Sequence, residues 1–139
     1  MSTAAPERTL TVLVYSDDAT VRTAVRTALG RRPAADLPRV EYVECATEPM
    51  VIRHLDAGGV DLAVLDGEAV PAGGMGICRR MKNEIYDAPP VLLLLGRPQD
   101  AWLATWSQAE AVVPHPLDPV VLAEAAAALL RPRAALTQA

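Results

Sequence analysis

Acidic residues follow two short apolar runs of the chain. Asp17 and Asp18 come after the run Leu10 to Tyr15, and Asp66 comes after the run Leu62 to Leu65. If both runs are neighbouring parallel strands, the carboxylates of Asp17 and Asp66 converge at one edge of a sheet, where like charges repel. Protonation or a bound cation relieves this repulsion, and Mg²⁺ fits because it prefers hard oxygen ligands. The competing interpretation is that each aspartate only caps the helix that follows it.

A phosphate-binding loop is the other chemistry that such a sheet edge can carry. It needs a glycine-rich or hydroxyl-rich segment after the first strand, so that backbone N–H groups face the phosphate. The segment Ser16 to Thr20 presents carboxylates instead. The glycine-rich segment Pro71 to Gly76 has no phosphate-loop spacing, and we interpret it as a flexible turn.

Five apolar runs without polar alternation are separated by five segments of helical period. Such runs are typical of strands covered on both faces of a parallel sheet. The predicted strands are Leu10 to Tyr15, Val40 to Glu44, Leu62 to Leu65, Val91 to Leu95 and Ala111 to Val113, and the predicted helices are Ala19 to Leu29, Glu48 to Ala57, Met75 to Ile85, Pro98 to Ser107 and Pro119 to Leu130. This order predicts a three-layer α/β sandwich, the (βα)5 flavodoxin-like fold, with a five-stranded parallel sheet in the order 2-1-3-4-5. Ligands of such sheets bind beyond the carboxyl ends of the strands.

The composition predicts one domain over residues 1–139, with a folded core at about 9–131 and flexible termini at 1–8 and 132–139. The apolar stretches fall short of the ~20 residues that cross a bilayer, which predicts no membrane span. The N-terminus lacks the pattern of a signal peptide, which predicts a cytoplasmic protein. A net charge of −4 argues against nucleic-acid binding. Cys45 and Cys78 lack metal-ligand spacing and are interpreted as buried, reduced thiols.

Four segments together resemble the landmarks of response-regulator receiver domains, which have the CheY-like fold. These segments are Val12 to Asp18, Asp61 to Asp66, Pro90 to Leu95 and His115 to Leu117, and the resemblance covers about residues 9 to 131. It implies a role in two-component phosphorelay signalling, with Asp66 accepting a phosphoryl group from a sensor histidine kinase. It also implies a Mg²⁺ site formed by Asp17, Asp66 and the backbone carbonyl of Glu68, with Asp18 and Ser16 as further candidate ligands.

The chain departs from this family at four positions. Ser16 stands in place of the first acid of the metal-binding pair, so we expect weakened affinity for Mg²⁺. Leu95, followed by Gly96, stands where the family has a hydroxyl residue at the end of the fourth strand. Val112 replaces the aromatic residue of the fifth strand. We therefore expect an atypical receiver, either a weakly phosphorylated switch or a module whose binding does not depend on phosphate.

His115 replaces the family lysine, and the proline that follows it, Pro116, is retained. A fixed unit charge about 4 Å from a phosphoryl oxygen is worth on the order of 4 kcal/mol at an effective dielectric constant of 20. A neutral imidazole supplies much less, although a protonated one can replace the lysine charge. The alternative is a loop histidine that only hydrogen-bonds a neighbour. His54 is interpreted as a helix-surface residue.

Trp102 and Trp106 lie four residues apart on the predicted fourth helix and share a face. Core packing is the default for such a pair. The resemblance instead suggests the face formed by the fourth helix, fifth strand and fifth helix, through which receivers meet partners. Because tryptophan is enriched at binding hot spots, we hypothesise that at least one indole is exposed there.

The sequence thus favours a stand-alone receiver that is not an enzyme and acts by contact with a target protein, with a homodimer as a further option. A phosphorylation-independent binding module of the same fold is the first alternative. A phosphoaspartate-type phosphatase using the motif Asp66-Gly67-Glu68 is less favoured, because that motif follows the third strand. A small-ligand-binding domain without phosphate chemistry is the last alternative.

Overall fold

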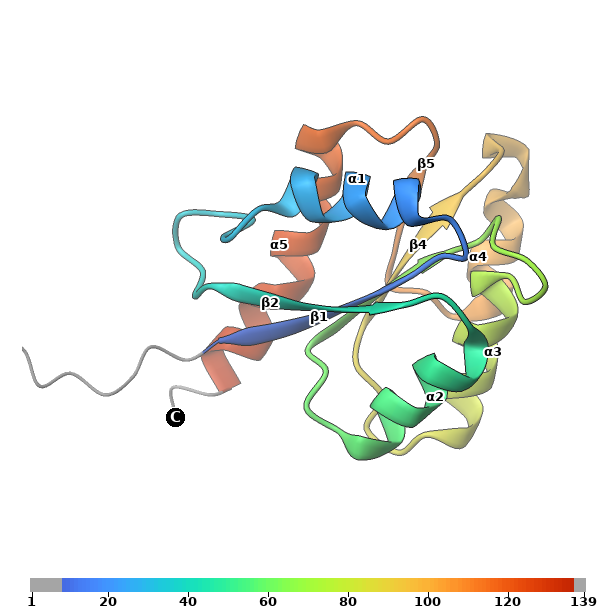
Figure 1. Ribbon diagram of the computed structural model, residues 1–139, viewed down its shortest axis with the longest axis horizontal. Helices are drawn as coiled ribbons and strands as arrows, with labels where there is room; N and C mark the ends of the chain where they lie inside the picture. Colours follow the sequence, from blue (N-terminus) through green and yellow to red (C-terminus); the bar gives the residue numbers. More distant parts are fainter. Residues whose placement is uncertain (1–8, 137–139) are drawn as a thin grey trace, which may run out of the picture.

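A computed structural model describes residues 9–136, with the side chains of Pro98 and Leu103 outside the description. Strands and helices alternate along the chain (Figure 1). In order, they are β1 (Leu10–Tyr15), α1 (Ala19–Leu29), β2 (Val40–Cys45), α2 (Glu48–Ala57), β3 (Leu62–Asp66), α3 (Gly74–Glu84), β4 (Val91–Leu95), a 3₁₀ turn η1 (Pro98–Asp100), α4 (Ala101–Ser107), β5 (Ala111–Pro114) and α5 (Pro119–Leu136).

The five strands form one parallel sheet in the order β2-β1-β3-β4-β5. Helices α1 and α5 cover one face of the sheet, and α2, α3 and α4 cover the other (Figure 1). The predicted three-layer flavodoxin-like fold and its strand order are therefore confirmed. All crossovers place the loops that follow the strands at one edge, as parallel pairing with helical connections requires.

Alternate residues of each strand enter two separate cores. In β3, Leu62 and Val64 pack toward α1 and α5, whereas Ala63 and Leu65 pack toward α2, α3 and α4. All four are fully buried. Asp66 follows Leu62 and Val64 at the same spacing of two residues, so it points to the same side of the sheet, directly after the apolar part of the strand. The strand period therefore directs the Asp66 carboxylate to the α1 and α5 side of the sheet edge.

Side chains cap three of the helices in the described part of the chain. Asp18 accepts the backbone N–H of Thr20 at the start of α1, Thr47 accepts that of Met50 in α2, and Asp118 accepts that of Val120 in α5. At the other ends, Gly30 closes α1 and Gly58 closes α2 with positive φ angles of 62° and 79°.

Replacing Thr47 by Ala removes the N-cap of α2 and should lower the free energy of unfolding by about 1 kcal/mol, because an N–H of the first turn loses its acceptor. Urea unfolding followed by circular dichroism measures this loss. Thr23→Ala on the exposed face of α1 is the matched control, since Thr23 caps no helix, and it should change stability by less than about 0.5 kcal/mol. Equal losses in both variants would contradict the assignment.

The structure corrects the predicted end of the last helix. Instead of ending at Leu130, α5 continues to Leu136 with Pro132 inside it, so residues 132–136 are not a flexible tail. Ala134 is only 7% exposed and packs on the core. The guanidinium of Arg131 binds Asp36 at 2.8 Å, and that of Arg133 lies 3.6 Å from the Asp61 carboxylate. These contacts hold the last turns, whereas residues 1–8 and 137–139 lie outside the described part of the chain.

Within residues 9–136, no helix is both long enough and apolar enough to span a membrane.

Candidate functional site

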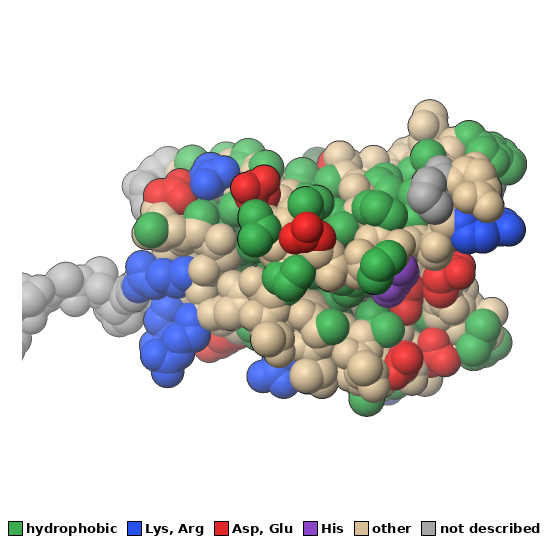
Figure 2. All heavy atoms as spheres, turned by 90° about the horizontal axis from the view of Figure 1, so that it is seen from above, with side chains coloured by type: hydrophobic (Ala, Val, Ile, Leu, Met, Phe, Trp, Pro, Cys, Tyr) green, Lys and Arg blue, Asp and Glu red, His purple; other side chains and the backbone are tan. Residues whose placement is uncertain are grey.

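A pocket of about 360 Å³ opens at the carboxyl edge of the sheet. Six of the residues singled out from the sequence meet there, together with Val21. The lining residues are Asp17, Asp18, Val21, Asp66, Glu68, Gly96 and His115. Viewed from above, a histidine side chain lies among acidic side chains at this end of the molecule (Figure 2). The expected convergence of Asp17 and Asp66 on one pocket is therefore observed.

Asp66 is 3% exposed, and both of its carboxylate oxygens have partners. The hydroxyl of Ser16 donates to Oδ2 at 2.8 Å, and the backbone N–H of Glu68 donates to Oδ1 at 2.9 Å. The Nε2 atom of His115 lies 3.4 Å from Oδ1. Two hydrogen bonds thus stabilise the ionised carboxylate, and each oxygen keeps a lone pair for a further partner.

Ser16 is fully buried beneath the pocket and links β1 to the start of α1. While donating to Asp66, its hydroxyl accepts the backbone N–H of Asp18 at 3.0 Å. Its carbonyl accepts a hydrogen bond from Arg22 at 2.7 Å, and Arg22 also pairs with Glu44 at 3.1 Å. Where the family has an acid, this chain therefore places a neutral donor directed at the phosphoacceptor candidate.

Asp17 and Asp18 have different roles. Asp18 is the N-cap of α1, so the capping interpretation is correct for it. Asp17 is exposed, and its Oδ1 accepts the backbone N–H of Val70 at 3.1 Å, which joins the loop after β1 to the loop after β3. Asp66 does not cap α3, because Gly73 is the N-cap of that helix. Asp17 and Asp66 are thus positioned by the fold rather than by a helix end.

The imidazole of His115 is turned into the pocket. Its Nε2 atom is buried without a hydrogen-bond partner, and the side chain as a whole is 26% exposed. The peptide between His115 and Pro116 is cis. The interpretation of His115 as a loop residue that only hydrogen-bonds a neighbour does not hold for Nε2. This atom lies instead 3.4 Å from Oδ1 of Asp66.

The remaining switch positions lie outside the pocket. Leu95 is 2% exposed and packs on the face covered by α2, α3 and α4. Val112, on β5, is 36% exposed. Pro116 is exposed beside His115. No side-chain hydroxyl or aromatic ring at Leu95 or Val112 therefore connects the pocket to α4 and β5.

The position of the Glu68 side chain was not predicted from the sequence. Its carboxylate lies over Gly96, so that a Cβ atom added to Gly96 would overlap it. The only signal in the sequence was the glycine directly after β4. From the sequence, the backbone carbonyl was the only group of Glu68 to which we assigned a function.

Burial raises the pKa of four groups outside the pocket, Tyr15, Tyr42, Cys45 and Cys78. Burial, and then the charge of Asp17, raises the pKa of Tyr15, whose hydroxyl donates to the carbonyl of Ala72. Burial raises the pKa of the Cys45 and Cys78 thiols to about 11. Both thiols are free and buried, as expected. They remain protonated near neutral pH and behave as small apolar groups.

The donors at the pocket fit a weakly held Mg²⁺ ion. Mg²⁺ takes one or two protein carboxylates and keeps several water molecules. Asp17 and Asp66 both line the pocket, and the oxygens of Asp66 keep free lone pairs. Within residues 9–136, no three His, Cys, Asp or Glu side chains are grouped closely enough to hold a metal ion. The pocket therefore offers a metal ion only a few ligands from the protein.

Both tryptophans are exposed, Trp102 by 68% and Trp106 by 48%. The hypothesis that at least one indole is exposed is confirmed. The guanidinium of Arg79, on α3, lies 5.3 Å from the ring centroid of Trp106 and donates to its carbonyl at 2.7 Å. Trp106 therefore lies on the side of α4 that faces α3, rather than on the face of α4, β5 and α5 that the resemblance suggested.

We expect acrylamide to quench the tryptophan fluorescence of the folded protein efficiently, because both indoles reach solvent. The quenching constant should be at least half of that in urea. In Trp102→Phe, the remaining emission from Trp106 should be quenched less, because Arg79 covers one side of that ring. A folded protein whose fluorescence resists quenching would contradict the described positions.

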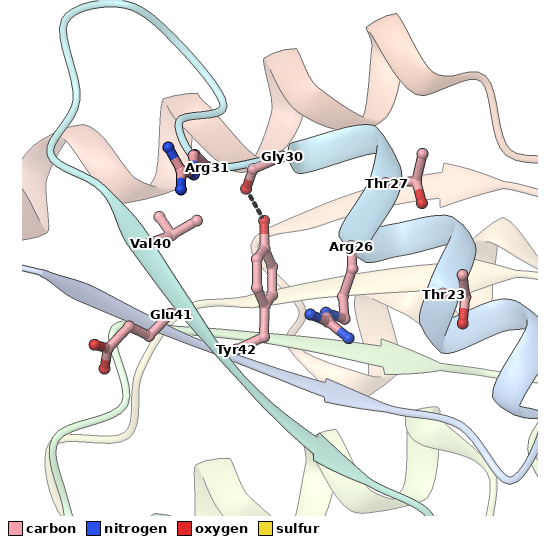
Figure 3. Close-up of a pocket in the computed structure, with 8 residues that line it drawn as sticks. All are labelled: Thr23, Arg26, Thr27, Gly30, Arg31, Val40, Glu41 and Tyr42. Carbon is pink, nitrogen blue, oxygen red and sulfur yellow. Dashed lines mark hydrogen bonds between the residues drawn. The ribbon is translucent and has the colours of Figure 1, made fainter.

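A second pocket, of about 740 Å³, lies between α1 and the edge strand β2 (Figure 3). The Tyr42 hydroxyl donates to the carbonyl of Gly30, and the guanidinium of Arg26 lies 5.5 Å from the Tyr42 ring centroid (Figure 3). Arg26 is also bound to Glu44 at 2.9 Å. These polar groups satisfy one another, and the cavity shares no lining residue with the pocket at Asp66.

Comparisons with known proteins agree with this geometry. The chain matches no protein-family model. It is 58% identical over 122 residues to uncharacterised response regulatory proteins of Mycobacterium tuberculosis strains CDC 1551 / Oshkosh and H37Rv, covering 88% of this chain and 92% of theirs. The receiver domain of a Francisella response regulator superposes with a TM-score of 0.74 at 14% identity, covering 89% of this chain and 98% of that one. A Vibrio cholerae chemotaxis protein superposes with a TM-score of 0.72 at 17% identity, covering 88% of this chain and all of that one.

Proposed function

The chain belongs to the response-regulator receivers of two-component signalling, and on this premise we propose that Asp66 is its phosphoacceptor. The observation that carries the proposal is the pocket at the carboxyl edge of the sheet. There the Asp66 carboxylate is held by Ser16 and by the backbone of Glu68, and it faces His115 and Asp17.

The proposed reaction is transfer of a phosphoryl group from a phosphohistidine of a sensor histidine kinase. A carboxylate oxygen of Asp66 attacks the phosphorus. The new O–P bond forms as the P–N bond breaks, and the electron pair leaves with the imidazole nitrogen of the kinase, which takes up a proton. Ser16 and the N–H of Glu68 orient the nucleophile during this step. His115 is placed to donate a hydrogen bond to the transferred group.

We propose that Asp17, Asp66 and the backbone carbonyl of Glu68 hold Mg²⁺ during transfer, with Asp18 at the rim of the site. When bound, the ion would supply positive charge to the phosphoryl oxygens. Ser16 is a donor to Asp66, so it supports the acceptor rather than adding a charge to the metal site. Affinity for Mg²⁺ is therefore proposed to be weak.

Incubation with acetyl phosphate and Mg²⁺ tests the proposal. Intact-mass measurement should show one added phosphoryl group per chain, hydroxylamine should remove it because it is an acyl phosphate, and borohydride reduction should locate it at Asp66. Labelling should fall when Mg²⁺ is omitted. Absence of labelling at high donor concentration, or labelling at another residue, would overturn the proposal.

The proposed output is contact with a target protein through the surface of α4, β5 and α5, without a catalysed reaction. The exposed side chains Trp102 and Val112, with Val120 and Val121 at the start of α5, support a protein-binding role. A homodimer would use the same kind of surface. No nucleic-acid partner is proposed, because the chain is acidic.

A second candidate function is a protein-binding module that works without phosphorylation. It is favoured by Leu95 and Val112, which provide neither the hydroxyl nor the aromatic ring that would connect the pocket to α4 and β5. The variant Asp66→Asn distinguishes the two functions, as argued in the Discussion.

A further inference from the structure

The carboxylate of Glu44, on the edge strand β2, joins two arginines of helix α1. Arg22 and Arg26 lie four residues apart and share one face of the helix. The Nε atom of Arg22 lies 3.1 Å from Glu44 Oε1, and the Nη1 atom of Arg26 lies 2.9 Å from Oε2. Arg26 also lies beside the ring of Tyr42 (Figure 3). Both oxygens of Glu44 are therefore bound to α1.

Arg22 makes a second contact, to the connection between β1 and α1. Its Nη1 atom donates to the carbonyl oxygen of Ser16 at 2.7 Å, while its Nε atom donates to Glu44. Only 16% of the Arg22 side chain is exposed. A guanidinium is planar, so two hydrogen bonds from different nitrogen atoms fix both its position and its orientation. Arg22 thus ties the backbone of Ser16 to the edge strand.

Every polar atom of Ser16 has a partner. Its N–H donates to the carbonyl of Cys45 at 3.2 Å, and its carbonyl accepts the bond from Arg22. Its hydroxyl accepts the N–H of Asp18 at 3.0 Å and donates to Asp66 Oδ2 at 2.8 Å. Because the residue is fully buried, water does not compete for these groups. The direction of the hydroxyl therefore depends on where the backbone of Ser16 is held.

We propose that Arg22, held by Glu44, is a positioning residue for phosphoryl transfer, because through the Ser16 carbonyl it keeps the Ser16 hydroxyl directed at Asp66. This inference rests on the proposed function of Asp66 as phosphoacceptor. Arg22 does not line the pocket, so it acts on the orientation of the nucleophile and not on the donor. A small misplacement of a reacting group from a distant change is enough to slow a reaction.

Arg22→Gln should lower the maximal rate of labelling by acetyl phosphate about tenfold and leave the half-saturating donor concentration unchanged, because only the nucleophile is disturbed. Arg22→Lys should lose most of the rate too. An ammonium group keeps the charge but lacks the planar fork that bonds Ser16 and Glu44 together. A native rate in Arg22→Lys, or a raised half-saturating concentration with an unchanged maximal rate in Arg22→Gln, would assign the effect to charge and overturn the inference.

The matched control is Arg80→Gln on α3. Arg80 also pairs with two carboxylates, those of Glu48 and Glu84, but it lies outside the pocket at Asp66. Its loss makes the same charge change and should leave the labelling rate unchanged. Circular dichroism and urea unfolding check that each variant is folded.

A double-mutant cycle shows whether Arg22 acts through Ser16. Ser16→Ala alone should lower the maximal rate about tenfold, because Asp66 loses the donor to Oδ2. Adding Arg22→Gln to this variant should lower the rate by less than about twofold more, since the group that Arg22 positions is already absent. Fully additive losses would mean general structural damage and would overturn the inference.

Amide NMR spectra give a reading that does not depend on labelling. The N–H groups of Asp18 and Glu68 bond to the Ser16 hydroxyl and to the Asp66 carboxylate, so their signals should shift in Arg22→Gln. Unshifted signals and a native rate, with labelling still at Asp66, would overturn this inference alone. If the native chain is not labelled at Asp66, the proposed function fails, and the inference fails with it.

Discussion

Asp66→Asn should abolish labelling by acetyl phosphate, with a loss of at least a hundredfold, while the protein stays folded. An amide oxygen is a poor nucleophile and forms no stable phosphoryl ester, so the acceptor itself is removed. Asparagine has nearly the same shape; its Oδ1 can accept the Glu68 N–H, and its Nδ2 can donate to the Ser16 hydroxyl oxygen. Circular dichroism and urea unfolding check that the fold is retained, and intact-mass measurement checks the labelling.

The matched control for this variant is Asp56→Asn on α2, an exposed aspartate outside the pocket, which should be labelled at the native rate. Retention of labelling in Asp66→Asn would show that another residue is the acceptor. The same variant separates the two candidate functions once a target protein is available. Unchanged target binding by Asp66→Asn would favour the phosphorylation-independent module, and loss of regulated binding would favour the switch.

His115→Lys should raise the rate of labelling between tenfold and a thousandfold. The Nε2 atom of His115 lies 3.4 Å from Asp66 Oδ1, within reach of the transferred group. A permanent charge about 4 Å from a phosphoryl charge is worth at most about 4 kcal/mol at an effective dielectric constant of 20, which is roughly a thousandfold. Desolvation of the lysine offsets part of this gain. Stopped-flow fluorescence or timed mass measurement gives the rate.

The matched control uses the other histidine of the chain. His54→Lys introduces the same charge on α2, outside the pocket, and should change the rate by less than twofold. If both variants raised the rate equally, net charge rather than position would be the cause. If His115→Lys left the rate unchanged, His115 would have no part in binding the phosphoryl group.

The sequence predicted the elements well because they depend on local patterns. The fully buried strands, such as β3 and β4, have continuous apolar runs, and the helices α1 and α2 have both a cap residue and a terminal glycine. From these signals, the first and last residues of α1 and α2 were predicted correctly. The meeting of Asp17 and Asp66 then followed from strand order alone, because the carboxyl ends of parallel strands share one edge.

Features that depend on contacts between distant side chains were not predicted. The continuation of α5 through Pro132 depends on Ala134 reaching the core and on Arg131 meeting Asp36. Local rules place a helix end before a proline, and here the tertiary contacts outweigh that preference. The contact of Trp106 with Arg79 likewise depends on the packing of α4 against α3, which no local pattern encodes.

The pairing of Ser16 with Asp66 was missed for a related reason. The sequence identified Ser16 as a departure from the family and assigned it to the metal, because the family position is a metal ligand. A serine hydroxyl, however, can donate a hydrogen bond, whereas a carboxylate can only accept one. In the structure it therefore points to the neighbouring anion.

The serine hydroxyl in place of an acid also changes how far the stability of the unliganded protein depends on divalent cations. Two facing acids would repel each other and make folding depend on a counter-ion, whereas Ser16 compensates Asp66 from inside the chain. The Ser16 hydroxyl thus leaves the pocket with one acidic group fewer and gives Asp66 a hydrogen-bond donor within the chain. Removal of divalent cations with a chelator should therefore not change the midpoint temperature of thermal unfolding.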